Sequence, residues 1–280
     1  MGDVGLPVIF VLLLVLAAEF VNGWTDAPNA IATVVATRVL TPHRAVLMAS
    51  ALNTLGALSG TAVAATIGKG IVRAGAITIW TVAAAMLGIV LWSTLAWYYG
   101  LPTSESHALI AGLTGAGLAV GGPGVLLWDG WRLVLIGLLF STFLGFLGGL
   151  ALMMSLYRLL QQARPGGIRK IFGRLQVLSA AFMAFSHGSN DGQKFIGVFT
   201  LTLFLGGLLP EFRVPLWVIF LCAGVMGCGT MVGGWRIIRT MGLRLTKLEP
   251  VHGFAAETSA AVAIELASRL GIPLSTTHTI

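Results

Sequence analysis

Residues 186–194 read SHGSNDGQK and set Ser, His, Asn, Asp, Gln and Lys side chains in the middle of apolar sequence. LQVLSAAFMAF (175–185) precedes this stretch, and FIGVFTLTLFLGG (195–207) follows it. Burying a polar group without a hydrogen-bond partner is costly, and burying an unpaired charge is far more so. We therefore expect Asp191 to face a partner, a cavity or an ion.

The composition is typical of a membrane protein. The chain has 280 residues, 56% hydrophobic and 10% charged, whereas soluble domains carry about 25% charged residues. The net charge of +7 comes from basic residues in short loops between apolar runs, which fits the positive-inside bias and not nucleic-acid binding. Cys222 and Cys228 share one apolar run, which favours packing over a disulfide or zinc site. We expect a lipid-embedded, multi-pass protein of a bacterial or archaeal inner membrane.

Eight apolar runs approach the length of a membrane-spanning helix, which is about 20 residues. Because lipid offers the backbone no hydrogen-bond partners, such runs fold as helices. The sequence thus predicts an all-α polytopic membrane protein with broken helices and re-entrant, hairpin-like segments. The candidate runs are 6–21, 45–67, 74–99, 104–122, 131–156, 176–210, 214–235 and 254–270.

The most hydrophilic stretch divides the chain near its middle. Residues 157–174 contain five cations and no acid, which predicts a cytoplasmic connector between a first repeat, 1–156, and a second, 175–280. If 104–122 spans fully, the amino terminus is outside, the basic loop 38–44 is inside and the repeats are inverted. If 104–122 is re-entrant, the amino terminus is inside and 69–73 moves inside instead. The charge bias does not separate the two.

The chain contains an internal duplication. Shifting it by 165 residues lays NGWTDAPNAIATVVAT (22–37) over HGSNDGQKFIGVFTLT (187–202), so that Asp26 meets Asp191. Shifting it by 171 residues lays GLPTSESH (100–107) over GIPLSTTH (271–278). Two matches in the same order are strong support for a duplicated unit. The second copy stops two residues after its motif, so we expect either a fragment or a fold completed by another chain.

Paired polar interruptions at corresponding places mark the substrate site of many transporters. We expect the segments around Asp26 and Asp191 to unwind, so that carboxylates and freed carbonyls bind a hard cation such as Na⁺. Hydroxyls and amides after Pro102 and Pro273 would meet an oxyanion. The predicted substrate-binding residues are Asp26, Asn29, Ser104, Ser106, Asn190, Asp191, Lys194, Ser275, Thr276 and Thr277.

A second set of residues is expected to bind the coupling ion or to position the substrate-binding residues. Each has a purely structural alternative: Asn53 can simply pack helices, and the two histidines can cap them. Glu257 is favoured over Glu265 because Thr258 and Ser259 adjoin it, and Glu19 is a candidate interior proton or cation group. The set is Asn22, Thr25, Asn53, Glu105, His107, Glu257 and His278.

These motifs resemble those of the inorganic phosphate transporter (PiT) family. Its duplicated G-A-N-D-V-A-N-A-like motif corresponds to GWTDAPNA (23–30) and GSNDGQKF (188–195). Its duplicated P-x-S-[ST]-[ST]-H-like motif corresponds to PTSESH (102–107) and PLSTTH (273–278). The resemblance implies inverted repeats around a central site for phosphate and coupling cations, in a secondary transporter that is not an enzyme and has no organic cofactor.

Three residues depart from the family pattern: Thr25 and Lys194 replace asparagines, and Glu105 replaces a hydroxyl residue. We hypothesise that Lys194 provides a fixed positive charge where relatives bind a cation, and that it pairs with Asp191, Glu105 or the oxyanion. This leaves Na⁺ and H⁺ both open as coupling ions.

Other functions remain open at this point. A permease for another oxyanion such as sulfate, or for a metal–phosphate complex, would have similar motifs. A channel would need a continuous polar path, whereas here the polar residues cluster at discrete breaks. An intramembrane hydrolase would use a Ser–His pair such as Ser275 and His278, but the duplication of that pair argues against a single catalytic site. A homodimer is compatible with the sequence.

Overall fold

The computed structural model describes residues 5–26, 28–244 and 247–280, and the regular structure of this part is helical apart from one isolated bridge between Val72 and Leu126. The predicted all-α fold is therefore confirmed. The main helices are α1 (Leu6–Asp26), α2 (Pro28–Ala36), α3 (Pro42–Ala57), α4 (Ala62–Gly70), α5 (Ile79–Tyr99), α6 (Glu105–Gly121), α7 (Trp128–Leu160), α8 (Pro165–Leu205), α9 (Leu216–Val232), α10 (Trp235–Arg239), α11 (Pro250–Arg269) and α12 (Thr276–Thr279).

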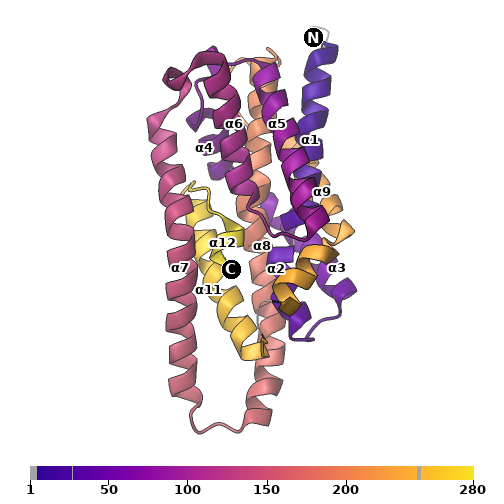
Figure 1. Cartoon of the computed structure of the whole chain (residues 1–280), viewed down its shortest axis with the longest axis vertical. Helices are drawn as coiled ribbons and strands as arrows, with labels where there is room; N and C mark the ends of the chain where they lie inside the picture. Colours follow the sequence, from indigo (N-terminus) through magenta and orange to yellow (C-terminus); the bar gives the residue numbers. More distant parts are fainter. Residues whose placement is uncertain (1–4, 27, 245–246) are drawn as a thin grey trace.

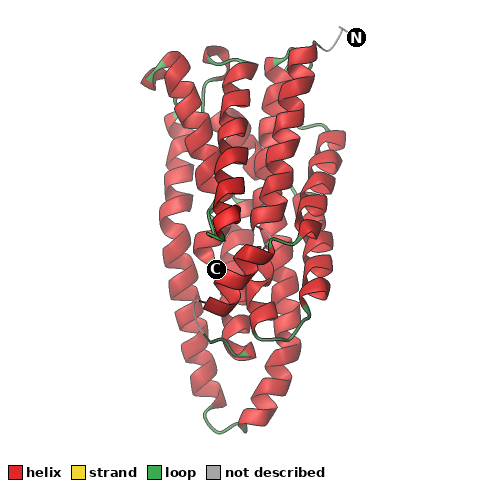
Figure 2. Ribbon diagram, turned by 45° about the vertical axis from the view of Figure 1, so that its right-hand side comes forward, coloured by secondary structure: helices red, strands yellow, loops and turns green. Residues whose placement is uncertain are grey.

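Helices α1 and α8 carry the two aspartate motifs and run in opposite directions along the long axis of the molecule (Figure 1). Helix α1 starts at one end, whereas α8 starts at the other, directly after the turn that follows α7. The 41 residues of α8 make it about 61 Å long at 1.5 Å per residue, twice the thickness of a bilayer core. The start of α8 and the end of α7 extend beyond the other helices (Figure 2). The predicted connector 157–174 is therefore mostly helical, and only 161–164 lies outside the two helices.

Helices α5 and α6 form a hairpin whose bend lies near the middle of the molecule, beside α12 (Figure 1). Gly100 ends α5 in the left-handed conformation, with φ of 69°, and Gly271 takes φ of 70° after α11. A residue with a Cβ adopts this conformation only at a cost, which explains glycine at both places. The two duplicated Pro-containing motifs therefore each follow a helix that ends at mid-height.

This hairpin corrects both topologies expected from the sequence, because each treated 74–99 as a complete crossing. The structure instead turns the chain back at 100–104, so that α5 and α6 enter and leave at the same end of the molecule (Figure 1). The physical reason is that the polar residues Ser104, Glu105 and Ser106 are buried in the protein interior rather than reaching water. Three passages remain before the turn at 161–164, namely α1 with α2, α3 with α4, and α7.

The apolar helices are long enough for a multi-pass membrane protein. By length and composition, three stretches qualify as spans among the described residues, namely α1 with α2 (Leu6–Ala36, apart from residue 27, which is not described), Ile79–Tyr99 and Trp128–Leu160. The number rises to five when the bent pairs α3–α4 (69°) and α9–α10 (56°) are each counted as one span. Only 17% of the most apolar window of α7 is buried, so this helix presents its Leu and Phe side chains outward, as lipid contact requires.

The prediction that the Asp191 motif unwinds is wrong, because α8 is one continuous helix from Pro165 to Leu205. The motif's glycines serve close packing instead. A Cβ on Gly188 would lie 2.1 Å from the carbonyl oxygen of Asn53, and a Cβ on Gly192 would lie 2.5 Å from the Cβ of Ala57. The glycines let the backbones of α3 and α8 touch, so this motif presents side chains rather than free backbone groups to its surroundings.

Candidate functional site

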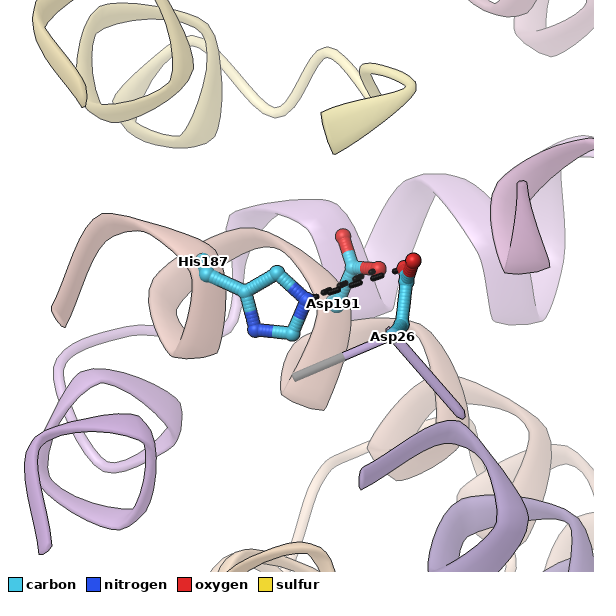
Figure 3. Close-up of side chains that lie close together, drawn as sticks. All are labelled: Asp26, His187 and Asp191. Carbon is cyan, nitrogen blue, oxygen red and sulfur yellow. Dashed lines mark ion pairs between the residues drawn. The ribbon is translucent and has the colours of Figure 1, made fainter. Parts of the chain in front are cut away.

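The two aspartates of the duplicated motifs lie side by side in the protein interior. Asp26 is at the end of α1 and Asp191 is in the middle of α8, and both are at most 1% exposed. His187, one turn before Asp191, faces both carboxylates: its Nε2 is 3.6 Å from Asp26 and 3.8 Å from Asp191 (Figure 3). The three groups each offer one ligand atom within 4.8 Å of the others, a spacing that a cation can bridge.

The second Pro-containing motif, residues 271–278, contacts both of these carboxylates. Thr276, the first residue of α12, lies with its hydroxyl 3.3 Å from Asp26 Oδ2 and 3.4 Å from Asp191 Oδ2. The next residue, Thr277, has its hydroxyl 2.9 Å from Asp26 Oδ1 and 3.1 Å from the carbonyl oxygen of Thr103. Residues from distant parts of the chain thus surround one point.

The two duplicated Pro-containing motifs meet through their serines, Ser104 after α5 and Ser275 after α11. Ser275 Oγ donates to Ser104 Oγ at 2.8 Å, and each serine also accepts the backbone N–H of the histidine three residues later. The rings of His107 and His278 lie next to each other, with centroids 4.9 Å apart, and each Nδ1 contacts its own serine. The serines are therefore helix N-caps and also form the contact between the two motifs. Each histidine ring lies against the serine of its own motif.

This contact gives a testable prediction about stability. Losing an N-cap hydroxyl costs about 1 kcal/mol, so Ser104→Ala and Ser275→Ala should each lower the free energy of unfolding by roughly that amount. The double variant should lose less than the sum of the two, because both single variants break the same hydrogen bond. SDS titration in mixed micelles would measure all three. Ser155→Ala is the matched control, since its hydroxyl bonds only to its own exposed helix. Strict additivity would contradict the contact.

Lys194 points into the same interior region and is 1% exposed. Its Nζ lies 2.5 Å from Asp191 Oδ1, 2.5 Å from Ser106 Oγ and 3.0 Å from the carbonyl oxygen of Leu274. Of the three partners considered from the sequence, the structure thus shows Asp191, and Glu105 is not among its hydrogen-bond acceptors.

The two other departures from the family pattern contact each other. Thr25 donates its hydroxyl to Glu105 Oε1 at 2.9 Å, and Ser93 donates to Glu105 Oε2 at 2.8 Å. Glu105 is 1% exposed, so these two hydroxyls solvate its carboxyl group in place of water. Nearby in α1, Asn22 donates to Glu19 Oε2 at 3.3 Å.

Glu257 belongs to a separate polar cluster between α2, α8 and α11. Thr33 and Ser179 donate short hydrogen bonds to its two carboxylate oxygens, and the side-chain amide of Gln176 lies 3.3 Å from Oε1. Glu257 is fully buried, whereas Glu265 pairs with Arg269. Glu257 forms no hydrogen bond to the aspartates of the central site.

Two of the predicted asparagines, Asn190 and Asn53, contact residues that surround the two aspartates rather than the aspartates themselves. The side chain of Asn190 bonds Ser268 at 2.9 Å and accepts the backbone N–H of Leu274 at 3.2 Å, so it shapes the loop before α12. Asn53 donates to Thr230 at 3.2 Å and lies 3.1 Å from Nδ1 of His187, whose orientation it supports.

Sequence reasoning missed several residues that take part. His187 could have been found, because it lies four residues before Asp191 and so on the same face of a helix. The others carry no local signal, since an isolated Ser, Thr or Gln in an apolar helix usually bonds its own backbone. Besides His187, they are Thr33, Ser93, Gln176, Ser179 and Ser268.

The charges of the central site restrict what it can bind. Two carboxylates approach each other there, with one lysine and one histidine as compensating groups. An anion entering beside the carboxylates would be repelled unless a positive charge came with it, because Coulomb energies are large in a buried, low-dielectric site. The hydroxyls of Thr276 and Thr277 suit either an oxyanion or a hard cation.

Comparisons with known proteins agree with this architecture. The family model described as "Phosphate transporter family" matches residues 22–166 and 160–280. The chain is 43% identical to a "Probable low-affinity inorganic phosphate transporter" of Rhizobium meliloti, over 94% of this chain and 79% of that one. It is 37% identical to a protein with the same description from Bacillus subtilis, over 97% of this chain and 83% of that one.

A solved structure described as "The sodium-dependent phosphate transporter" superposes with a TM-score of 0.89, over 98% of this chain and 87% of that one, at 22% identity. That likeness supports the fold. The relatives are named as transporters, which agrees with the expectation of a multi-pass cell-membrane protein that is not an enzyme. The chain belongs to the phosphate transporter family.

Proposed function

We propose that this protein takes up inorganic phosphate by cation symport, through alternating access to the central site. The observation that carries the proposal is the convergence on Thr276, whose hydroxyl lies within 3.4 Å of carboxylates from both aspartate motifs. Binding groups from both halves of the chain thus meet at one buried point, so that a relative motion of the halves would open the site to either side.

We propose further that 1–156 and 175–280 form inverted repeats joined at the basic stretch 157–174. Their aspartate helices run antiparallel (Figure 1), which supports this relation. The positive-inside bias puts the turn at 161–164 in the cytoplasm. The start of α1 lies at the opposite end of the molecule and would face outside, with the loop 38–44 inside.

Cation coupling follows from the electrostatics of the site. Phosphate is an anion at neutral pH, and both aspartates would repel it in a buried site. A cation bound between Asp26 and Asp191 reverses that repulsion, so that phosphate and cation bind better together than separately. Sodium, a proton or a divalent metal each meets this requirement, and His187 adds a nitrogen ligand that suits a transition metal.

Uptake of radiolabelled phosphate into proteoliposomes tests the proposal, with Na⁺ and pH gradients varied separately and with arsenate and sulfate as competitors. We expect saturable accumulation driven by a cation gradient, inhibited by arsenate more than by sulfate. Flux that needs no gradient would indicate a channel, and stronger inhibition by sulfate would indicate a permease for another oxyanion. Chemical turnover of the substrate without accumulation would indicate an enzyme.

A further inference from the structure

Lys194 is held as a bound cation would be. Its ammonium group has three N–H donors, and three oxygens from three different segments lie within 3.0 Å of it: a carboxylate of α8, a hydroxyl of α6 and a carbonyl of the loop before α12. The group is almost completely buried, so no water replaces any of these contacts. A carboxylate, a hydroxyl and a carbonyl are also the ligands that hard cations prefer.

The other half of the site has the same kinds of oxygen, two of which contact a neutral side chain. Asn29 donates through Nδ2 to Asp26 Oδ1 and, at 2.9 Å, to Thr277 Oγ1. The same Thr277 hydroxyl lies 3.1 Å from the carbonyl oxygen of Thr103. The amide oxygen of Asn29 is buried and has no hydrogen-bond partner within the described residues, so the Asp26 half retains an unused acceptor. It has no lysine, and the basic group beside Asp26 is the ring of His187, which also faces Asp191.

The two sets correspond atom by atom under the duplication. In both halves the carboxylate comes from one aspartate motif, the hydroxyl from one of the two Pro-containing motifs and the carbonyl from the other. The hydroxyl and carbonyl oxygens also touch in both, at 2.7 Å for Ser106 with Leu274 and 3.1 Å for Thr277 with Thr103. The sequence shifts of 165 and 171 residues match Asp26 with Asp191, Asn29 with Lys194, Thr103 with Leu274, and Ser106 with Thr277.

We propose that Lys194 permanently occupies the position of one coupling cation, so that this protein transports one cation fewer per phosphate than a site with asparagine in both halves. The inference rests on the proposed cation symport and deepens it. The tethered ammonium neutralises Asp191 at every stage of transport, whereas Asp26 depends on a cation from solution. The two halves of a duplicated site thereby have different roles.

The Lys194→Asn variant tests this, because it restores the side chain found at the equivalent position of the first repeat. We expect the variant to gain a Na⁺ site, seen as a rise of several degrees in Tm with added NaCl over an equal ionic strength of N-methylglucamine chloride. In proteoliposomes, phosphate uptake by the variant should depend on Na⁺ more steeply than uptake by the parent protein. Lys170→Asn, on the exposed part of the same helix, should change neither property.

A second variant distinguishes the gain of a Na⁺ site from the effect of losing the lysine charge. Lys194→Met removes the ammonium but adds no oxygen, so it should lose uptake without gaining Na⁺-dependent stability. If Lys194→Asn folds and gains neither Na⁺ stabilisation nor a steeper Na⁺ dependence, the proposal is wrong. The stabilisation is measured in detergent and does not depend on transport, so a parent protein that accumulates no phosphate in proteoliposomes would count against the symport proposal alone.

The unmodified protein provides a readout that does not depend on any variant folding. Dual-label uptake of radioactive sodium and phosphate gives their ratio directly. We expect no more than one Na⁺ per phosphate, because Lys194 fills one of the two equivalent positions. A ratio of two or more would overturn the assignment of Lys194 as a resident cation.

Discussion

Phosphate uptake by the Asp26→Asn variant is expected to fall by about 100-fold at subsaturating phosphate. Asp26 accepts hydrogen bonds from Asn29 and Thr277 and lies near the hydroxyl of Thr276 and the ring of His187. Hydrogen bonds to a charged group contribute about 1.5–3 kcal/mol each, and each 1.4 kcal/mol is about a factor of ten in binding. Losing the charge therefore weakens both the contact between the repeats and any cation bound there.

The measurement is the initial rate of radiolabelled phosphate uptake into proteoliposomes, normalised to the amount of correctly inserted protein. Asp129→Asn is the matched control: it makes the same chemical change at an exposed position in the first turn of α7, and its uptake should stay close to that of the parent protein. Asp26→Asn with uptake within a few-fold of the parent would show that this carboxylate is not part of the transport site.

The second large effect concerns folding. Gly188→Ala should prevent α8 from packing on α3, because the added Cβ would lie 2.1 Å from the carbonyl oxygen and 2.6 Å from Cα of Asn53. Both are backbone atoms, so no side chain can rotate away, and the helices must separate. Overpacking ordinarily costs about 1–3 kcal/mol, and a clash with the backbone of Asn53 belongs at or above the top of that range.

We expect Gly188→Ala to give little monodisperse protein in size-exclusion chromatography after detergent extraction, and any folded fraction to show a strongly lowered Tm. Gly224→Ala in α9 is the control, because nothing lies within 4 Å of a Cβ at that position. Alanine favours helix by up to about 1 kcal/mol over glycine, so this control should be as stable as the parent protein or more stable. Equal behaviour of the two variants would contradict the close contact of α3 and α8.

The stretch 186–194 illustrates how far the sequence could be interpreted. Its polar residues were expected to mark an unwound segment of a substrate site, yet they lie on an intact helix and have different tasks. Asp191 and Lys194 face the centre, whereas Gln193 accepts the backbone N–H of Val63 at 3.0 Å and Ser189 contacts Ser59 at 3.2 Å. The latter two support the bend between α3 and α4, which no pattern in 186–194 itself indicates.

The departures from the family pattern also needed the structure. Thr25 and Glu105 are separate departures in the sequence, and only their hydrogen bond reveals that they form one unit. They are 80 residues apart, so no local periodicity connects them. Similarly, the sequence is compatible with three partners for Lys194. Lys194 pairs with Asp191 because the two residues lie three positions apart on one helix and because the loop before α12 also contacts its ammonium group.

The sequence by itself determined the membrane class, the all-helical fold, the duplicated motifs and the family resemblance, because composition and recurrence are properties of the chain that need no packing. Only the tertiary structure decided that α5 and α6 turn back together, that α8 stays unbroken through its polar motif, and which oxygen each buried polar group contacts. These outcomes depend on helices from distant parts of the chain approaching to backbone contact at glycines such as Gly56 and Gly188. The free energy of those approaches is set by the neighbouring segment, which the local sequence does not specify.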